Sequence, residues 1–274
     1  MLIRRPLLSD VLRFGKNQVA DQVGPSALPF EQGQGGAARL FHGIKSLSTA
    51  NHYASAADAQ PRGATTLTEA VLFRLDGLPA ADEILCGHGP VSGAAGGHNI
   101  WIANAGDSAR LSIVDGAGAI KTSPTSAFAA GDVGKVFLIT GVYNNTDVRL
   151  YRQGALVGAG GTASTGYAAT DVDVKSALGC GYTATGAATF GAPDVTIIGW
   201  AVSQSTALSA AQVLEHYNSC VAAKDMALFP AGTEYRWRVS QNKTVAASFV
   251  DDVGGISLAL AGTPVYEAFA GTWG

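Results

Sequence analysis

The sequence predicts an all-β fold: a sandwich of many short strands, with one short helix and an extended N-terminal arm. Short stretches in which apolar and polar residues alternate recur along the chain between turn-forming residues, which is typical of sandwiches and barrels. Glycine is abundant, at 35 of 274 residues, and only 14% of residues are charged, against about 25% in average soluble proteins. Strands do not alternate with helices, so a parallel α/β sheet is disfavoured.

Composition also excludes several classes of function. A net charge of −3 gives the chain no overall basic character, so we expect no nucleic-acid partner. No apolar run approaches the roughly 18 residues of a membrane-spanning helix. The N-terminus has neither the continuous apolar segment nor the cleavage site of a secretion signal, so we expect a chain made in the cytoplasm. Cys86, Cys180 and Cys220 form no CxxC pair, which favours buried free thiols over disulfides or zinc.

Residues 1–36 form an N-terminal arm that differs from the rest of the chain. PLLSDVLRFG (6–15) favours one or two helical turns, and VGPSALPFEQGQGG (23–36) is broken by prolines and glycines. An arm without a core needs its own domain or a partner to hold it, and we expect a partner. The residues predicted to dock the arm are Arg4, Arg5, Leu12 and Phe14.

Strand signals begin near residue 37 and continue as a series. TTLTEAVLFRLDG (65–77) alternates well, and KVFLITGVY (135–143) is a continuous apolar run that indicates a central buried strand. Hairpin turns are predicted at AGDS (105–108) and at the Gln-Gly pair 153–154. The other predicted strands are residues 83–89, 98–104, 109–115, 147–154, 155–161, 177–183 and 195–202.

One helix is predicted after the strand 195–202. Ser209 is a good N-cap, and Gln212 three residues later completes a capping box. Val213, Leu214 and Tyr217 recur at helical spacing and are expected to face inward. We therefore expect a short helix of about two turns that covers one edge or end of the sheets.

Three motifs, in order, resemble the concanavalin A-like, laminin G-like jelly-roll domains. DVTIIGWAVSQSTALSAAQVLEHYN (194–218) resembles their closing strand and helix, and DVRLYRQGALVG (147–158) resembles their hairpin. TTLTEAVLFRLDG resembles an aromatic-bearing strand, with Phe73 in the aromatic position. The resemblance covers residues 37–225 and implies the fold rather than a function, because function lies in sites placed on a fold. The other matching residues are Leu150, Tyr151, Gly154, Leu156, Val157, Asp194, Ile197, Trp200, Leu208, Ser209, Gln212 and Tyr217.

The C-terminal segment 233–269 also resembles strands of this family, although these usually open the domain rather than close it. Its matching residues are Trp237, Asp252, Gly254, Gly255, Leu258, Leu260, Gly262, Thr263 and Pro264. We therefore divide the chain into an arm (1–36), a jelly-roll sandwich (37–225) and C-terminal strands (226–274). The last part either extends the same sandwich or forms a small appendage.

The sequence lacks the common catalytic patterns. Glucanases on the resembling fold carry ExDxxE or ExDxE on one strand, since retaining hydrolysis needs two carboxyl groups about 5 Å apart. The segments ADEIL (81–85), DVDV (171–174) and VDDV (250–253) lack that spacing. GxSxG does not occur, and Cys86 near His88 has no third group to orient it. We therefore expect no enzyme activity.

Calcium is the one cofactor that the resemblance suggests, because several relatives bind it at loop tips through Asp, Asn and backbone oxygens. The first candidate ligands are Asn144, Asn145 and Asp147 in YNNTD, and the second set is Asp251 and Asp252. These residue types are more common in plain turns. The favoured expectation is therefore no cofactor, with calcium as the alternative.

A glycan site needs an exposed aromatic ring and a few amide or acid groups. HNIWIAN (98–104) offers His98, Asn99 and Trp101, after the glycine-rich SGAAGG (92–97). Trp101 shares a strand face with Asn99, and that face is either solvent-exposed or the inner side of the sheet. A core position is the favoured one for this tryptophan.

These observations lead to a first hypothesis and two alternatives. The first is a non-catalytic structural or adhesion module, docked by its arm on the surface of a larger assembly such as a virion decoration or tail component. The alternative is a carbohydrate-binding, lectin-like module. A glycoside hydrolase or lyase with an unusual site is the least favoured.

Overall fold

The computed structural model describes residues 39–54, 65–90, 97–115, 119–158, 162–163, 175–183, 186–241 and 247–274. The arm, with Arg4, Arg5, Leu12 and Phe14, lies outside the described residues. Residues 39–274 form one compact unit. The fold below is that of this unit.

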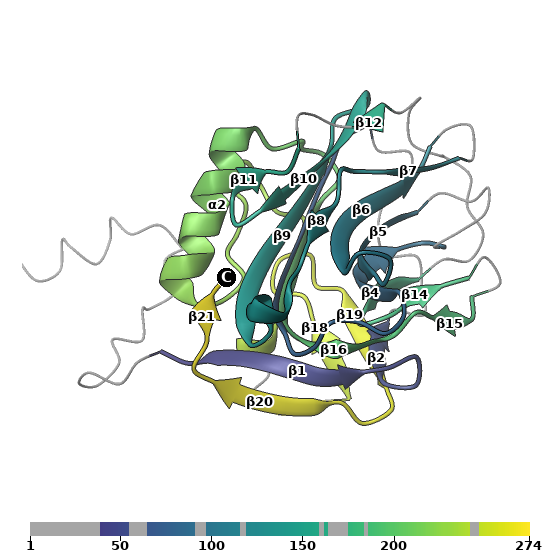
Figure 1. Cartoon of the computed structure of the whole chain (residues 1–274), viewed down its shortest axis with the longest axis vertical. Coiled ribbons are helices and arrows are strands. Elements are labelled where there is room, and N and C mark those ends of the chain that lie inside the picture. The colour runs from purple at the N-terminus through teal and green to yellow at the C-terminus, as the bar shows by residue number, and fades with distance from the viewer. Residues whose placement is uncertain are drawn as a thin grey trace, which may run out of the picture. The chain divides into compact units, whose positions relative to one another are not determined.

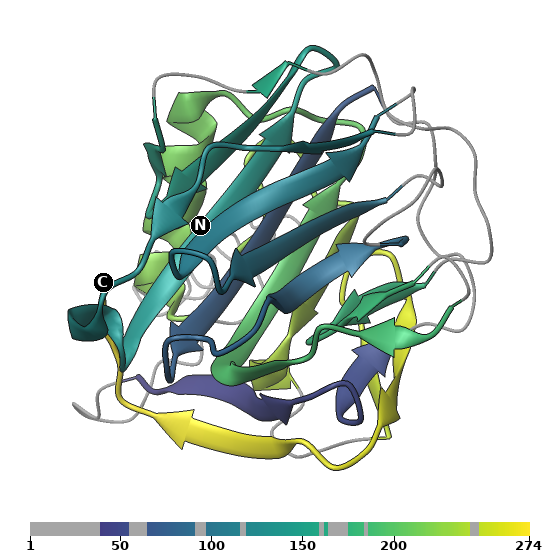
Figure 2. The same ribbon diagram turned by 45° about the vertical axis from the view of Figure 1, so that its right-hand side comes forward.

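Two large sheets, which we name A and B, build this unit (Figures 1 and 2). The strands of sheet A are β1 (Phe41–Leu47), β3 (Leu67–Leu75), β9 (Lys135–Tyr143), β10 (Asp147–Arg152), β11 (Ala155–Leu156), β12 (Thr162–Ala163), β16 (Ala192–Ser203), β17 (Tyr235–Arg238), β20 (Val265–Phe269) and β21 (Thr272–Trp273). Along the sheet the order is β11-β10-β9-β3-β16-β1-β20, and β12, β17 and β21 pair with β10, β16 and β9.

The strands of sheet B are β2 (His52–Ala54), β4 (Glu83–His88), β5 (His98–Ala103), β6 (Ser108–Val114), β7 (Ile120–Thr122), β8 (Ser126–Ala127), β13 (Ser176–Leu178), β18 (Ser248–Val250) and β19 (Ser257–Ala261). They run in the order β18-β19-β2-β13-β4-β5-β6-β7, with β8 beside β6. A small hairpin, β14 (Gly181–Tyr182) and β15 (Ala188–Thr189), and two single-turn 3₁₀ helices, η1 (Ala130–Asp132) and η2 (Val239–Gln241), complete the described elements apart from one α-helix.

Strand alternation decides what lies between the sheets. On β3, Val71 and Phe73 point into the main core, while Ala70 and Leu72 point to the opposite face of sheet A. On β5, Ile100 and Ile102 point into the same main core, so the residues between them point away from sheet A. The main core is thus a sheet-on-sheet interior, as expected of an aligned sandwich.

A second apolar layer lies on the outer face of sheet A, beneath α2 (Ala210–Ala223). Ser209 caps this helix, and the reciprocal bonds with Gln212 form the predicted capping box. The helix is longer than expected, with 14 residues, and it ends at Lys224 in the left-handed conformation. Val213 is buried, but Leu214 is 48% exposed, so the expectation that Leu214 faces inward is wrong. Figure 1 shows α2 at the left, on the side of sheet A away from β4–β7.

The C-terminal strands belong to both sheets. β20 pairs with β1, β17 with β16, and β19 with β2. The segment 226–274 therefore extends the same sandwich and is no separate appendage. Within the described part of the chain, no helix is long and apolar enough to cross a membrane, and Cys86, Cys180 and Cys220 are buried free thiols, as predicted.

Candidate functional site

The predicted hairpin of β5 and β6 builds the candidate site. Its turn uses positive φ angles at Gly106 (85°) and Asp107 (43°), a conformation that glycine adopts at no steric cost. This turn sets a register in which Trp101 lies opposite Arg110, and Asn99 lies opposite Ser112. All four side chains alternate with core residues, so they belong to the face of sheet B that points away from sheet A. We call it the outer face of sheet B.

Trp101 and Arg110 form a stacked pair on this face. The guanidinium carbon of Arg110 lies 3.7 Å from the centre of the Trp101 ring, well within the range of a cation–π contact. Both side chains are half-buried. Yet the Nε1 of Trp101 and the Nε of Arg110 are buried and have no hydrogen-bond partner, which is unusual for buried polar groups.

Arg110 has no carboxylate partner within the described residues. Burial lowers the pKa of its guanidinium from the usual value, and the more distant carboxylate of Asp82 offsets part of that effect. Asp82 itself accepts a hydrogen bond from the backbone N–H of Asn104 at 2.9 Å. The pair is therefore a partly desolvated cation on an aromatic ring, with unused donors.

The strand next to Trp101 contributes a buried apolar residue, and an exposed phenylalanine follows through a backbone contact. Ile84 on β4 lies directly opposite Trp101 and is 1% exposed. The backbone N–H of Ile84 donates to the carbonyl of Phe190 at 3.0 Å, and Phe190 is an aromatic side chain with 39% exposure. Sequence reasoning missed Arg110, Ile84 and Phe190. The hairpin register centred on residues 105 and 106 could have identified Arg110, since it pairs residue 101 with residue 110.

The three residues predicted to bind a glycan do not lie on the same face of sheet B. Asn99 and Trp101 lie on the outer face of sheet B, so the favoured core position for Trp101 is wrong. Asn99 is only 4% exposed. His98 points the other way, into the interior, and is fully buried, because consecutive residues of a strand face opposite sides.

His98 belongs to a polar network between the sheets. Its Nδ1 lies 3.0 Å from the Oε2 of Glu69 on β3, and the other oxygen of Glu69 accepts a hydrogen bond of 2.9 Å from the Trp200 indole. Trp200 in turn stacks on Trp237 with ring centres 4.4 Å apart. Burial and the neighbouring Glu69 raise the pKa of Cys86 well above its usual value. Because its thiol is kept protonated, Cys86 does not have the character of a nucleophile.

The first set of calcium candidates builds a tight turn. The Oδ1 of Asn144 accepts hydrogen bonds from the backbone N–H groups of Thr146 and Asp147, at 3.1 and 3.0 Å. Asn145 has a φ of 73°, and an oxygen of Asp147 binds Arg149 at 2.7 Å. The Oδ1 of Asp147 is buried without a hydrogen-bond partner. The Oδ1 of Asn144 and the Oδ2 of Asp147 already accept from protein donors, which fits a turn better than a calcium ligand set.

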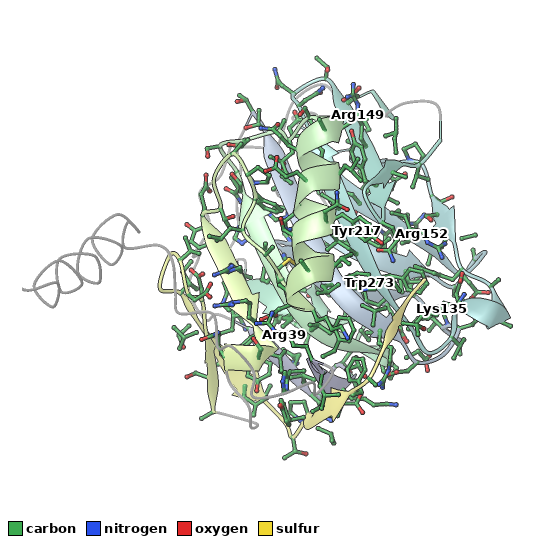
Figure 3. All side chains as sticks on the ribbon, turned by 90° about the vertical axis from the view of Figure 1, so that its left-hand side faces the viewer. Arg39, Lys135, Arg149, Arg152, Tyr217 and Trp273 are labelled. Atoms are coloured by element: carbon green, nitrogen blue, oxygen red, sulfur yellow. The ribbon has the colours of Figure 1, made fainter. Side chains whose placement is uncertain are left out.

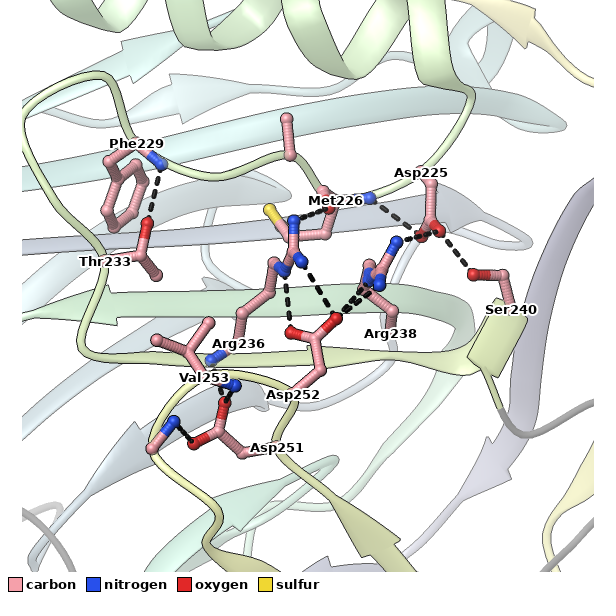
Figure 4. Close-up of polar contacts among 12 residues, drawn as sticks. Asp225, Met226, Phe229, Thr233, Arg236, Arg238, Ser240, Asp251, Asp252 and Val253 are labelled. Atoms are coloured by element: carbon pink, nitrogen blue, oxygen red, sulfur yellow. Dashed lines mark hydrogen bonds and ion pairs between the residues drawn. The ribbon is translucent and has the colours of Figure 1, made fainter. Parts of the chain in front are cut away.

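The second set, Asp251 and Asp252, belongs to the network of Figure 4. Asp251 accepts from the backbone N–H groups of Arg236, Val253 and Gly254 at 2.5 to 2.8 Å. Asp252 binds Arg236 through both carboxylate oxygens at 2.8 Å and also pairs with Arg238. Within the described ranges, no group of three or more His, Cys, Asp or Glu side chains is arranged to hold a metal ion.

Two neighbouring pairs of carboxyl groups are candidate catalytic acids. Glu83 is 2% exposed, and burial with the neighbouring Asp194 raises its pKa to about 8. Asp76 and Glu267 share the hydroxyl of Thr196 at 2.6 and 2.7 Å, and Arg74 bridges the same two acids. Glu83 is buried, and Asp76 and Glu267 are bound to Thr196 and Arg74, so neither pair offers the two carboxyl groups on either side of a sugar bond that glycoside hydrolysis uses.

Comparison with known proteins adds to the fold. No protein-family model and no curated protein sequence matches the chain. A solved structure described as a putative carbohydrate binding protein from Bacteroides ovatus is similar, with a TM-score of 0.59 and 14% identity over 86% of this chain. The chain spans 62% of that protein's length. A pentraxin from Limulus polyphemus is similar with a TM-score of 0.49 and 12% identity, over 81% of this chain and 95% of the pentraxin.

The similarity to the Bacteroides ovatus structure and the two sheets together confirm the predicted fold, which is an all-β, concanavalin A-like jelly-roll sandwich with one α-helix among the described residues. At such low identity they establish the fold alone.

Proposed function

We propose that this chain is a non-catalytic carbohydrate-binding module, and that the outer face of sheet B around Trp101 and Arg110 is its binding site. One observation carries the proposal: a half-buried tryptophan is stacked by an arginine on a sheet face, and both side chains have unused hydrogen-bond donors. Such an unsatisfied arrangement lowers stability in the free protein. The terminal nitrogens of Arg110, which are not among the buried atoms, are the donors that a ligand can reach.

Trp101 and Arg110 combine aromatic and polar surface, which is the combination that a sugar site needs. Small-molecule sites combine an apolar base with a few polar groups that fix orientation. Trp101 provides the aromatic surface, and Arg110 provides polarity. The similar protein from Bacteroides ovatus is described as a putative carbohydrate binding protein, and this description supports the proposal without deciding it, since folds are shared among functions.

The first hypothesis from the sequence analysis is that the chain docks on a virion or similar particle through its N-terminal arm. It has no support from the described residues, because the arm lies outside them. It stays a prediction. A glycan site on the sandwich does not depend on it.

The proposal can be tested by screening the full chain on a glycan array and measuring the affinity for any hit by calorimetry. Trp101→Ala should weaken binding at least about tenfold, as expected for a central aromatic anchor. Trp273→Ala is a matched control, because Trp273 is also half-buried but contacts Tyr217 and Phe41 on the outer side of sheet A (Figure 3). Equal affinity of wild type and Trp101→Ala, or no binding to any glycan, would overturn the proposal.

A further inference from the structure

The arginines of the two sheets differ in their partners. Arg74, Arg149, Arg152, Arg236 and Arg238 each pair with a carboxylate at 3.0 Å or less. Arg110 stands apart, because its one close contact among the described residues is the ring of Trp101, and the carboxylate of Asp82 acts on it only from a greater distance. A partly buried charge without a counter-ion is unfavourable, and proteins usually pair it.

The geometry of Arg110 restricts how a counter-ion can reach it. Its Nε is buried without a partner, so that atom is shielded from solvent. Its two terminal nitrogens make no hydrogen bond to described residues. They are also absent from the set of buried atoms without a partner, so they are accessible to solvent. The accessible edge of the guanidinium is therefore the one with two parallel N–H donors. This edge matches the two oxygens of a carboxylate.

We infer that the ligand of this face is an acidic sugar, whose carboxylate binds the terminal nitrogens of Arg110 while its ring packs beside Trp101. This inference rests on the proposed function and names the chemical class of its ligand. The stacking contact fixes the plane of the guanidinium, so the donors are oriented before the ligand arrives. A neutral sugar would leave the cation unpaired.

The first test compares two probes with the same sugar backbone, of which one carries free carboxylates and the other uncharged methyl esters. One is an oligosaccharide of galacturonic acid, and the other is the same oligosaccharide with its carboxyl groups methyl-esterified. Calorimetry on the full chain should give at least about tenfold tighter binding of the acid, as a charge-assisted bidentate contact predicts. The difference should shrink with added salt, because screening weakens exposed ion pairs.

Variants assign the effect to Arg110. Arg110→Gln should abolish the preference for the acid form, while Arg110→Lys, which keeps the charge but not the fork, should retain part of it. Arg149→Gln is the matched control, because Arg149 is partly exposed and paired with Asp147. It should leave the preference unchanged.

The outcomes separate this inference from the proposed function. Equal binding of the acid and the ester, both reduced by Trp101→Ala, would overturn the acidic ligand and leave the glycan site intact. Binding of a sulfated galactan without binding of the uronic acid would also overturn it, because the carboxylate would then be the wrong anion. An acid preference that survives Arg110→Gln would exclude this arginine as its source.

Discussion

The outer faces of the two sheets are built in opposite ways. On sheet A, α2 and the segment after it close the face with apolar side chains such as Val213, Met226 and Phe229. On sheet B, the centre of the face carries Trp101 and Arg110, with donors that nothing in the described chain satisfies. A sheet face that is covered by packed apolar side chains contributes to stability. A sheet face with polar groups that lack partners can instead gain favourable contacts with a ligand. This contrast is the reason why we propose the binding site on sheet B rather than on sheet A.

The largest expected effect is on the closed face. Phe229 is 4% exposed and its ring packs on His216 with ring centres 4.7 Å apart. Phe229→Ala should lower the free energy of unfolding by about 3–5 kcal/mol, the usual range for a buried phenylalanine. Trp101→Ala, on the outer face of sheet B, should lower it by less than about 1.5 kcal/mol. Urea denaturation of both variants measures the difference, and equal losses would remove the distinction between the two faces.

The dependence of stability on pH provides the second prediction, because sheet B and the helix that covers sheet A each hold a buried titratable group. The pKa of Glu83 on sheet B is raised from 4.5 to about 8 by burial and by Asp194. The folded chain thus keeps a proton that the unfolded chain releases. This contribution is complete below pH 4.5 and is lost as the pH rises to about 8. By pH 7 the loss should be on the order of 3 kcal/mol.

His216 on α2 acts in the opposite direction, since burial lowers its pKa from 6.5 to about 4. Its contribution is complete above pH 6.5 and is lost as the pH falls to about 4. Stability should therefore have a maximum at mildly acidic pH. Glu83→Gln should remove the loss between pH 4.5 and 8, so the stability of the variant should rise from pH 4 to 6.5 through His216 and then stay level. Thermal unfolding from pH 4 to 8 checks this, and an unchanged alkaline side in the variant would contradict the assignment to Glu83.

The helix cap provides a smaller test of the closed face. Ser209 and Gln212 bond reciprocally at the start of α2. Ser209→Ala should lower stability by about 1 kcal/mol, the typical value for an N-cap. Glycan binding should be unaffected, because the helix lies on the other sheet. A loss of binding in Ser209→Ala would mean that the two faces are coupled.

The features that follow from local sequence were the predictable ones. The N-cap at Ser209, the strand of Phe73 and the β5–β6 turn all depend on neighbouring residues, and each forms as expected. Leu214 was misplaced because helical spacing alone allows a wide apolar stripe, and packing on sheet A selects Val213, His216 and Cys220 as its buried residues.

The candidate site was only partly predictable, because its environment depends on strands that are distant in sequence. Trp101 was identified, yet its face was left open, since Ile84 and the position of sheet A lie outside its own hairpin. Glu69 has the same parity as Val71 and Phe73 on β3, and its burial is made possible by His98 and Trp200 from two other strands. A local sequence pattern cannot predict these contacts between residues that are far apart in the chain.

The smallest expected changes in the free energy of unfolding come from two arginines that each stack on aromatic rings. Arg152 on sheet A lies over Phe137 at 4.5 Å, binds Asp132 at 3.0 Å and donates to the Ala127 carbonyl at 2.7 Å. Arg152→Gln should therefore lower the free energy of unfolding by about 1 kcal/mol.

Arg110 has the stacking contact alone, and the energy of that contact is offset by the desolvation of an unpaired charge. Arg110→Gln should change stability by less than about 0.5 kcal/mol in either direction, as is usual for positions without structural bonds. Parallel denaturation of the two variants checks this. A loss as large as that of Arg152→Gln would show that Arg110 is a structural residue. A negligible loss, together with a lost preference for the acidic sugar, would mean that the arginine is retained for its ligand, because stability then gives it no other role.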